Sequence, residues 1–126
     1  MNRTRILRTA LATTLASAAL TLGMTTPARA ADVVWSCTNT SSVHTCYAYT
    51  GAAGHYSGRI GVTANGSGWQ VVNVPAGGFT TVLRVWPTSG GSIDYPAGSN
   101  GRVLSYGISS IQLVVVGHET SNRIFI

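Results

Sequence analysis

The chain has 126 residues, and its formal net charge of +5 arises from eight basic residues, all of them arginine, and three acidic residues. Four of the arginines lie in the first 30 residues and none of the acidic residues does, so the remainder carries a net charge of 4 − 3 = +1. Proteins that bind nucleic acid or an anionic membrane surface present clustered basic residues. Separated arginines without any lysine argue against both partners.

Residues 1–30 have the organisation of a secretory signal peptide. Three arginines within the first eight residues precede a run rich in alanine and leucine, which ends at Ala28-Arg29-Ala30. This pattern predicts cleavage after Ala30 and a secreted protein. A membrane anchor is the alternative, but several threonines interrupt a run that is already short for a span, and we expect no membrane insertion. Removal of the signal leaves 126 − 30 = 96 residues, 31–126, which suit one small domain.

The two cysteines, Cys37 and Cys46, are close in sequence. Outside the cell such a pair predicts a disulfide, and closing a ring of about 10 residues stabilises the fold by about 2.5–3 kcal/mol. A redox or metal-binding role is the alternative. It has little support, because the spacing is not Cys-x-x-Cys and His44 is the one further ligand nearby in sequence.

The composition after residue 30 predicts an all-β fold. Glycine, threonine, serine and valine are abundant, residues that favour helices are few, and no stretch shows a sustained helical period. Runs rich in β-branched and aromatic residues alternate with turn-forming residues, as in small β-sandwiches and barrels. The predicted strands span residues 33–37, 44–50, 59–64, 69–74, 79–86, 102–106, 108–116 and 123–126, the last of them at a sheet edge. Residues 65–68 (NGSG) are predicted to form a hairpin turn.

One pattern occurs twice, as GFTTVLRV at 78–85 and as GISSIQLV at 107–114. Each copy has a glycine, a large apolar residue, two hydroxyl residues and a further apolar run. In a flat strand the two apolar residues that flank a hydroxyl pair point to opposite faces, so we expect the strand to bend or change role there. The repeat suggests a duplicated unit such as a Greek key. The alternative is chance, since these residue types are common in the chain.

The stretch CYAYTGAAGHYSGRI, residues 46–60, resembles the first hairpin of a β/γ-crystallin Greek key, in which an aromatic residue, any residue and a glycine fold the hairpin over the sheet. Tyr56-Ser57-Gly58 matches that motif, and FTTV (79–82) and ISSI (108–111) are similar to the last strand of a crystallin motif. The resemblance covers roughly residues 46–116 and implies a small, single-domain Greek-key β-sandwich. It implies that Gly58 adopts a backbone conformation that side chains disfavour, and that Tyr56 covers the core edge.

The sequence departs from the crystallin pattern at two places. Residues 86–102 lack an aromatic-x-glycine motif, and the paired Asn or Asp residues of the family's calcium sites are replaced by Ser105-Tyr106 in one half and Ala76-Gly77 in the other. Calcium requires carboxylate or amide oxygens. We therefore expect no metal at this site, and no feature of the sequence indicates a cofactor.

No arrangement of titratable residues predicts catalysis. The acidic residues lie in predicted loops or at the terminus of the domain, which does not suggest paired carboxylates for glycoside hydrolysis. No Gly-x-Ser-x-Gly elbow accompanies the histidines, and their spacing is not that of a zinc site. The residues considered are Asp32, Asp94, Glu119, His44, His55 and His118. We predict that the protein is not an enzyme.

The tryptophans and tyrosines divide into two groups according to the predicted elements. Five lie on or beside predicted strands and are expected to fill the core: Trp35, Tyr47, Tyr49, Trp69 and Trp86. The others lie next to glycines or a proline, where an exposed ring can stack on a sugar or a protein. The loop 89–102 is the longest irregular stretch and adds charged candidates. The predicted binding residues are Tyr56, Asp94, Tyr95, Arg102 and Tyr106.

The function that the resemblance implies is that of a secreted antimicrobial or antifungal, killer-toxin-like protein, expected to act as a monomer on cell-wall polysaccharide or another surface target. A second hypothesis is inhibition of an extracellular peptidase by insertion of Arg102 or Tyr95, although no disulfide stiffens that loop. A third is a subunit of a secreted assembly, because the apolar end RIFI (123–126) can pair with a partner's sheet edge.

Overall fold

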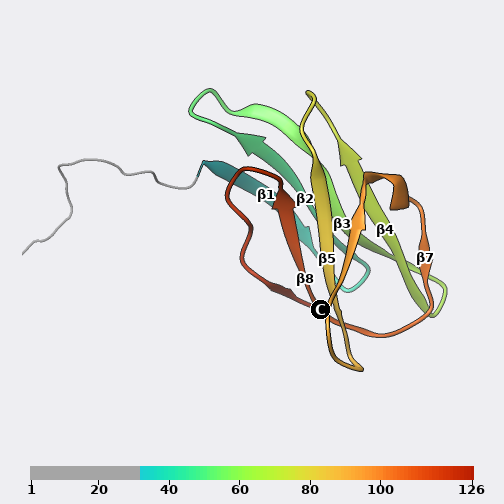
Figure 1. Ribbon diagram of the computed structural model, residues 1–126. Coiled ribbons are helices and arrows are strands. Elements are labelled where there is room, and N and C mark those ends of the chain that lie inside the picture. Colours follow the sequence, from blue (N-terminus) through green and yellow to red (C-terminus); the bar gives the residue numbers. More distant parts are fainter. Residues whose placement is uncertain (1–31) are drawn as a thin grey trace, which may run out of the picture. The chain divides into compact units, whose positions relative to one another are not determined.

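The computed structural model describes residues 32–126, which form an all-β unit (Figure 1). The expected signal peptide lies outside the described residues. Within residues 32–126 there are nine strands and one short 3-10 helix, η1: β1 (Val33–Asn39), β2 (Val43–Thr50), β3 (His55–Asn65), β4 (Gly68–Pro75), β5 (Thr81–Pro87), β6 (Ile93–Pro96), η1 (Ala97–Ser99), β7 (Val103–Leu104), β8 (Ile108–Val115) and β9 (Ile124–Phe125). The predicted all-β class is confirmed.

The strands form two antiparallel sheets that pack as the layers of a sandwich (Figure 1). One sheet has the order β1-β2-β3-β4-β7 and the other β6-β5-β8-β9. The strand β9 lies at an edge, as predicted for the C-terminal segment. The Greek key stays a prediction, because β7 joins the first sheet beside β4, the last strand of the β1–β4 meander, rather than beside its first.

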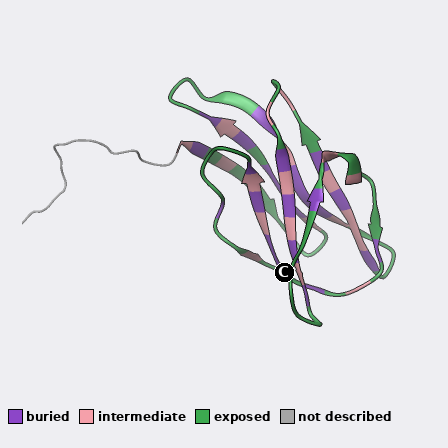
Figure 2. Cartoon of the chain, in the orientation of Figure 1, coloured by how far each residue is buried: buried purple, intermediate pink, exposed green. Residues whose placement is uncertain are grey.

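The core lies between the sheets and follows the two-residue period of the strands. Along β5, Leu83 and Val85 are fully buried, whereas Arg84 and Trp86 are half-buried on the opposite face (Figure 2). Successive side chains of a strand point to opposite faces, so this alternation separates core from surface. The main core cluster comprises Cys46, Ile60, Val62, Val71, Leu83, Val85, Tyr95, Leu104, Ile108, Ile111 and Leu113.

The disulfide joins an edge strand to its neighbour. Cys37 of β1 and Cys46 of β2 are direct cross-strand partners with their Cα atoms 4.0 Å apart, and the bond between them is formed. Cys46 is completely buried. The predicted disulfide is therefore confirmed, and it anchors β1 to the core.

The predicted hairpin turn at residues 65–68 connects β3 to β4. Asn65 pairs with Gly68, which leaves Gly66 and Ser67 as the two-residue loop. Gly66 has a φ of 60°, in the left-handed region that such hairpin turns require. The hairpin turn predicted for residues 65–68 is therefore confirmed.

The two hydroxyl pairs have different structural roles. In β8 the register shifts between Trp86–Ser110 and Pro87–Ile108, so Ser109 is an extra residue in a β-bulge. The bulge lets Ile108 and Ile111 both join the core. In the other copy Phe79 precedes β5 and the strand begins at Thr81, with no bulge at the pair. The predicted bend thus occurs at the second pair. At the first pair the chain changes from a loop to a strand.

A buried asparagine connects the two sheets. The Asn73 side chain, 1% exposed, donates Nδ2 hydrogen bonds to the carbonyls of Thr81 and Tyr95, both 3.0 Å long, and accepts one from the Thr81 hydroxyl. Its backbone N–H donates to Asn100 Oδ1 at 2.9 Å. Buried polar groups are tolerated when they are satisfied in this way, and these bonds tie β4 to β5 and β6.

Candidate functional site

Three tyrosines lie together on the outer face of the five-stranded sheet. Tyr47 and Tyr49 point outward from β2, since their neighbours Cys46 and Ala48 point into the core. Tyr56, at the start of β3, is the cross-strand partner of Tyr49. We call the surface formed by Tyr47, Tyr49, Tyr56 and Arg59 the tyrosine face.

The three rings of the tyrosine face form one cluster, in which the Tyr56 ring is tilted by 43° from that of Tyr47 and by 47° from that of Tyr49. The ring centroid of Tyr56 lies 6.1 Å from that of Tyr47 and 5.6 Å from that of Tyr49, within the range of aromatic pairs. Tyr47 is 42% exposed and Tyr56 is 41% exposed. Two large rings held by a sheet therefore meet the solvent side by side.

A bulge in β3 brings Tyr56 beside the other rings. The β2–β3 register passes from Ala48–Gly58 to Tyr49–Tyr56, so Ser57 is the extra residue, and its hydroxyl is buried against that of Thr50 at 2.6 Å. Gly58 has a φ of 145°, and a Cβ there would lie 2.8 Å from the carbonyl oxygen of Val74. The special backbone conformation expected at Gly58 is therefore present. Tyr56, expected to cover the core edge, lies outside the core on the sheet face instead.

Apart from Arg59, the strand positions around the tyrosine face hold uncharged side chains. Cross-strand pairing places Ser36, Tyr47, Arg59 and Val74 in one row, and the flanking rows hold Thr, Val and Gln side chains together with Gly61. Five of the exposed large hydrophobic residues of residues 32–126 lie on the outer face of the five-stranded sheet: Val34, Tyr47, Tyr56, Val74 and Val103. Two of them, Tyr47 and Tyr56, belong to the tyrosine face.

Arg59 is the one cation of the tyrosine face. Its guanidinium carbon lies 5.7 Å from the ring centroid of Tyr47. Among residues 32–126, Arg59 belongs to no ion pair, and its Nε is buried without a hydrogen-bond partner. Asp94 pairs with Arg84 and Asp32 with His118, so neither of these carboxylates neutralises Arg59.

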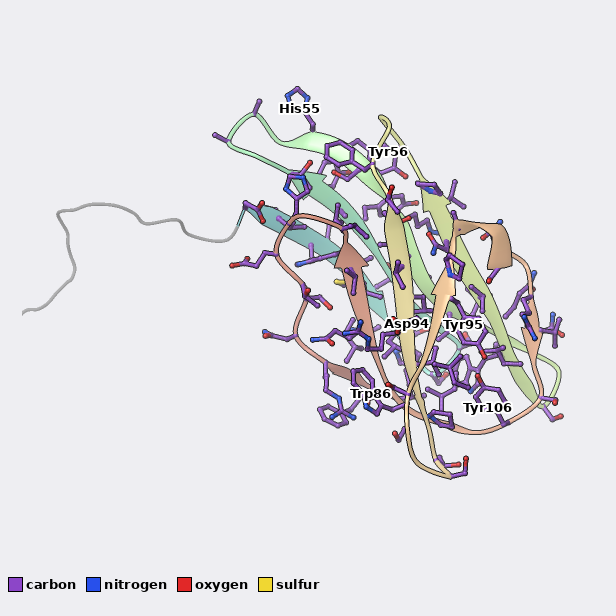
Figure 3. All side chains as sticks on the ribbon, viewed as in Figure 1. His55, Tyr56, Trp86, Asp94, Tyr95 and Tyr106 are labelled. Atoms are coloured by element: carbon purple, nitrogen blue, oxygen red, sulfur yellow. A yellow bond between two sulfur atoms is a disulfide. The ribbon has the colours of Figure 1, made fainter. Side chains whose placement is uncertain are left out.

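Tyr95 and Tyr106, both predicted to be exposed binding residues, form a hydrogen-bonded pair at the core (Figure 3). Tyr95 lies in β6 and is only 6% exposed, so its predicted exposure in a loop is wrong. Tyr106 lies between β7 and β8, because the strand predicted for residues 102–106 ends at Leu104, and it is half-buried, with its hydroxyl hydrogen-bonded to that of Tyr95. Burial raises the pKa of Tyr106 well above its usual value, and the hydrogen bond to Tyr95 raises it further as a smaller contribution.

The remaining predicted binding residues do not join the tyrosine face. Asp94 lies on the other sheet, where Arg84 Nε donates to its carboxylate at 2.8 Å, and that hydrogen bond lowers the pKa of Asp94. Arg102 is exposed, with its guanidinium 5.7 Å from the ring centroid of Tyr95. The structure therefore groups Arg102 with Tyr95 and Tyr106, and separates that group from Tyr56.

Three of the five aromatic residues predicted for the core point outward instead. Tyr47 and Tyr49 belong to the tyrosine face. Trp86 lies on the outer face of the four-stranded sheet, where the Arg123 guanidinium sits 3.9 Å from its ring centroid. Arg123 Nη2 also donates to Ser110 Oγ at 2.7 Å. The other two residues, Trp35 and Trp69, pack against the core as expected.

The three histidines lie in different parts of the fold: in β2, at the start of β3 and after β8. His44 is buried, its Nδ1 lies 3.0 Å from Asn39 Oδ1, and burial lowers its pKa. His118 pairs with Asp32 at 2.7 Å, whereas His55 is exposed and points away from the fold (Figure 3). Within residues 32–126 no three histidine, cysteine or acidic side chains come together as metal ligands. In the same part of the chain no helix has the length and hydropathy of a membrane span.

Comparison of the chain with protein-family models, with curated proteins and with solved structures found no significant match. The resemblance to the β/γ-crystallins therefore remains a prediction from short motifs. The candidate site rests on the geometry of the tyrosine face alone.

Proposed function

We propose that the protein is a small secreted binding protein, without catalytic activity, that recognises cell-wall polysaccharide through the tyrosine face. The observation that supports this function is the outward placement of Tyr47 and Tyr56, each about two-fifths exposed, on the outer face of the five-stranded sheet. Tyrosine rings present a large apolar surface and a polar hydroxyl group, so they can stack on pyranose rings while hydrogen-bonding to sugar hydroxyls.

The scaffold favours binding because it holds the rings in place before the ligand arrives. The tyrosines belong to β2 and β3, central strands of a sheet whose edge strand is anchored by the disulfide. A preorganised surface loses less conformational freedom on binding than a flexible loop does. An exposed sheet face suits an extended polymer better than a small molecule, because small molecules bind in clefts and cavities.

The test is depletion of the protein from solution by chitin, β-glucan and peptidoglycan. We expect at least one polymer to bind the protein and the Tyr47→Ala/Tyr56→Ala double variant to lose most of that binding. Phe125→Ala is the matched control, because Phe125 is 72% exposed on the other sheet. Equal binding by all three proteins, or no depletion of the wild type, contradicts the proposal. Near-ultraviolet circular dichroism checks that each variant is folded.

The antimicrobial role expected from the crystallin resemblance is a second part of this proposal. If polysaccharide binding causes it, the wild-type protein slows the growth of bacteria or fungi that carry the bound polymer, and the Tyr47→Ala/Tyr56→Ala variant does not. Unchanged growth with bound protein would leave a binding function without toxicity.

Membership of a secreted assembly is a second candidate function, supported by the C-terminal edge. Phe125 is the most exposed large hydrophobic residue of residues 32–126, and β9 leaves one side of its sheet open. A Phe125→Asp variant should then lose a co-purifying chain from the native source. The inhibitor hypothesis retains Arg102 only, because buried Tyr95 cannot enter a peptidase cleft.

A further inference from the structure

Arg59 makes the tyrosine face chemically selective. It is the direct cross-strand partner of Tyr47, and such partners have Cβ atoms about 5 Å apart. A sugar ring that stacks on Tyr47 is therefore adjacent to the guanidinium. The terminal nitrogens of Arg59 make no hydrogen bond or ion pair within residues 32–126, and unlike Nε they are not buried without a partner, so they remain in contact with solvent. They can donate paired hydrogen bonds to a carboxylate.

We propose that the polysaccharide bound by the tyrosine face is acidic, a pyranose polymer with carboxylate groups, and that Arg59 binds one of these carboxylates. The proposal rests on the function proposed above and defines its substrate class. No acidic residue of the described chain pairs with Arg59, so a ligand carboxylate does not have to displace an internal partner. A hydrogen-bonded carboxylate would also neutralise the charge of the Arg59 guanidinium, whose Nε is buried without a hydrogen-bond partner.

A carboxylate fits this site better than a polymer of phosphates. Polyphosphate ligands carry closely spaced charges, and proteins bind them with clusters of basic residues. The tyrosine face has a single arginine in a row of Ser, Tyr and Val side chains. One planar guanidinium beside an aromatic ring matches one planar carboxylate on a stacked sugar.

The experiment compares polygalacturonate with the same polymer after chemical reduction of its carboxyl groups, by affinity electrophoresis. The variants are Arg59→Gln, which removes the positive charge, and Arg59→Lys, which keeps the charge but removes the planar pair of N–H donors. Arg84→Gln is the control, because it removes the same charge from the other sheet. Thermal unfolding of each variant confirms that it is folded at the assay temperature.

We expect the wild-type protein to bind polygalacturonate about tenfold more tightly than the reduced polymer, equivalent to about 1.4 kcal/mol. Arg59→Gln should abolish this difference, Arg59→Lys should retain part of it and Arg84→Gln all of it. The preference should also shrink between about 0.1 and 1 M salt, over which the Debye length falls from about 10 to about 3 Å.

The outcomes separate this proposal from the proposed function. Equal binding of both polymers by the wild type and Arg59→Gln, with loss in Tyr47→Ala/Tyr56→Ala, refutes the acidic preference and supports a neutral polysaccharide. Absence of binding to these two polymers and to chitin, β-glucan and peptidoglycan refutes the polysaccharide function itself.

Discussion

Replacement of Asn73 by alanine should strongly destabilise the fold. The side chain is 1% exposed and takes part in three hydrogen bonds, two to backbone carbonyls and one from the Thr81 hydroxyl. At about 1 kcal/mol each, their loss costs about 3 kcal/mol, and the cavity adds to it. This is a large part of the 5–15 kcal/mol typical of a domain. The melting temperature should fall by about 12 °C or more.

Urea unfolding followed by tryptophan fluorescence measures this loss. The control is Gln70→Ala, which removes a side-chain amide from the outer face of the same strand, where its bond to Asn65 is exposed. That change should cost about 0.5 kcal/mol or less. Asn73→Asp keeps the shape but loses both donors beside two carbonyls, so it should be at least as harmful as alanine. If Asn73→Ala costs no more than Gln70→Ala, or if Asn73→Asp is tolerated, the hydrogen bonds do not stabilise the sandwich as argued.

Two further predictions concern Tyr106 and Gly58. The pKa of Tyr106 is raised above its ordinary 10.0 by burial and by the hydrogen bond to Tyr95. As the pH rises, this tyrosine therefore ionises in the unfolded chain before it ionises in the folded protein. The stability that it contributes is complete below pH 10 and is lost as the pH rises further. The stability difference between wild type and Tyr106→Phe should therefore shrink in urea titrations above pH 10, and a constant difference would contradict this. Gly58→Ala should cost more than about 1 kcal/mol, because φ is 145° and the new Cβ would lie 2.8 Å from Val74 O. Gly98→Ala, with nothing within 4 Å of its Cβ, should change the melting temperature little, and equal losses at both glycines would refute the steric argument.

Much of the local structure could be predicted from the chain alone. The segments of β-branched and aromatic residues became strands, Asn65 to Gly68 became a hairpin turn, and the two cysteines became a cross-strand disulfide. These features depend on neighbours in sequence, where period, turn chemistry and loop length are sufficient. The bulge at Ser109 was also anticipated, because no flat strand can direct both Ile108 and Ile111 into the core.

The candidate site is predicted less well, because the direction of each aromatic ring is inferred from the element in which it lies, strand or loop, and not from the face of the strand to which it points. Tyr56 is exposed, as predicted for a binding residue, although it does not cover the core edge as the crystallin resemblance implies. Tyr47 and Tyr49 point outward, whereas the sequence predicts both for the core. The alternation around Cys46 contains the missing signal, since a cysteine that faces the core directs its neighbour Tyr47 to the opposite side. Tyr95 shows the reverse error: a position beside Pro96 indicated a loop, but pairing of β6 with β5 turns the ring inward.

The sequence by itself determined the β class, the turns and the covalent link, because each is encoded in short stretches of chain. Only the tertiary structure decided which face of each strand is covered, because a strand has two faces and the packing of the second sheet chooses between them. That choice buries Tyr95 and Asn73, and it leaves Tyr47 and Tyr56 beside unpaired Arg59 on an open sheet. The candidate binding surface therefore comes from strand pairing rather than from any motif in the sequence.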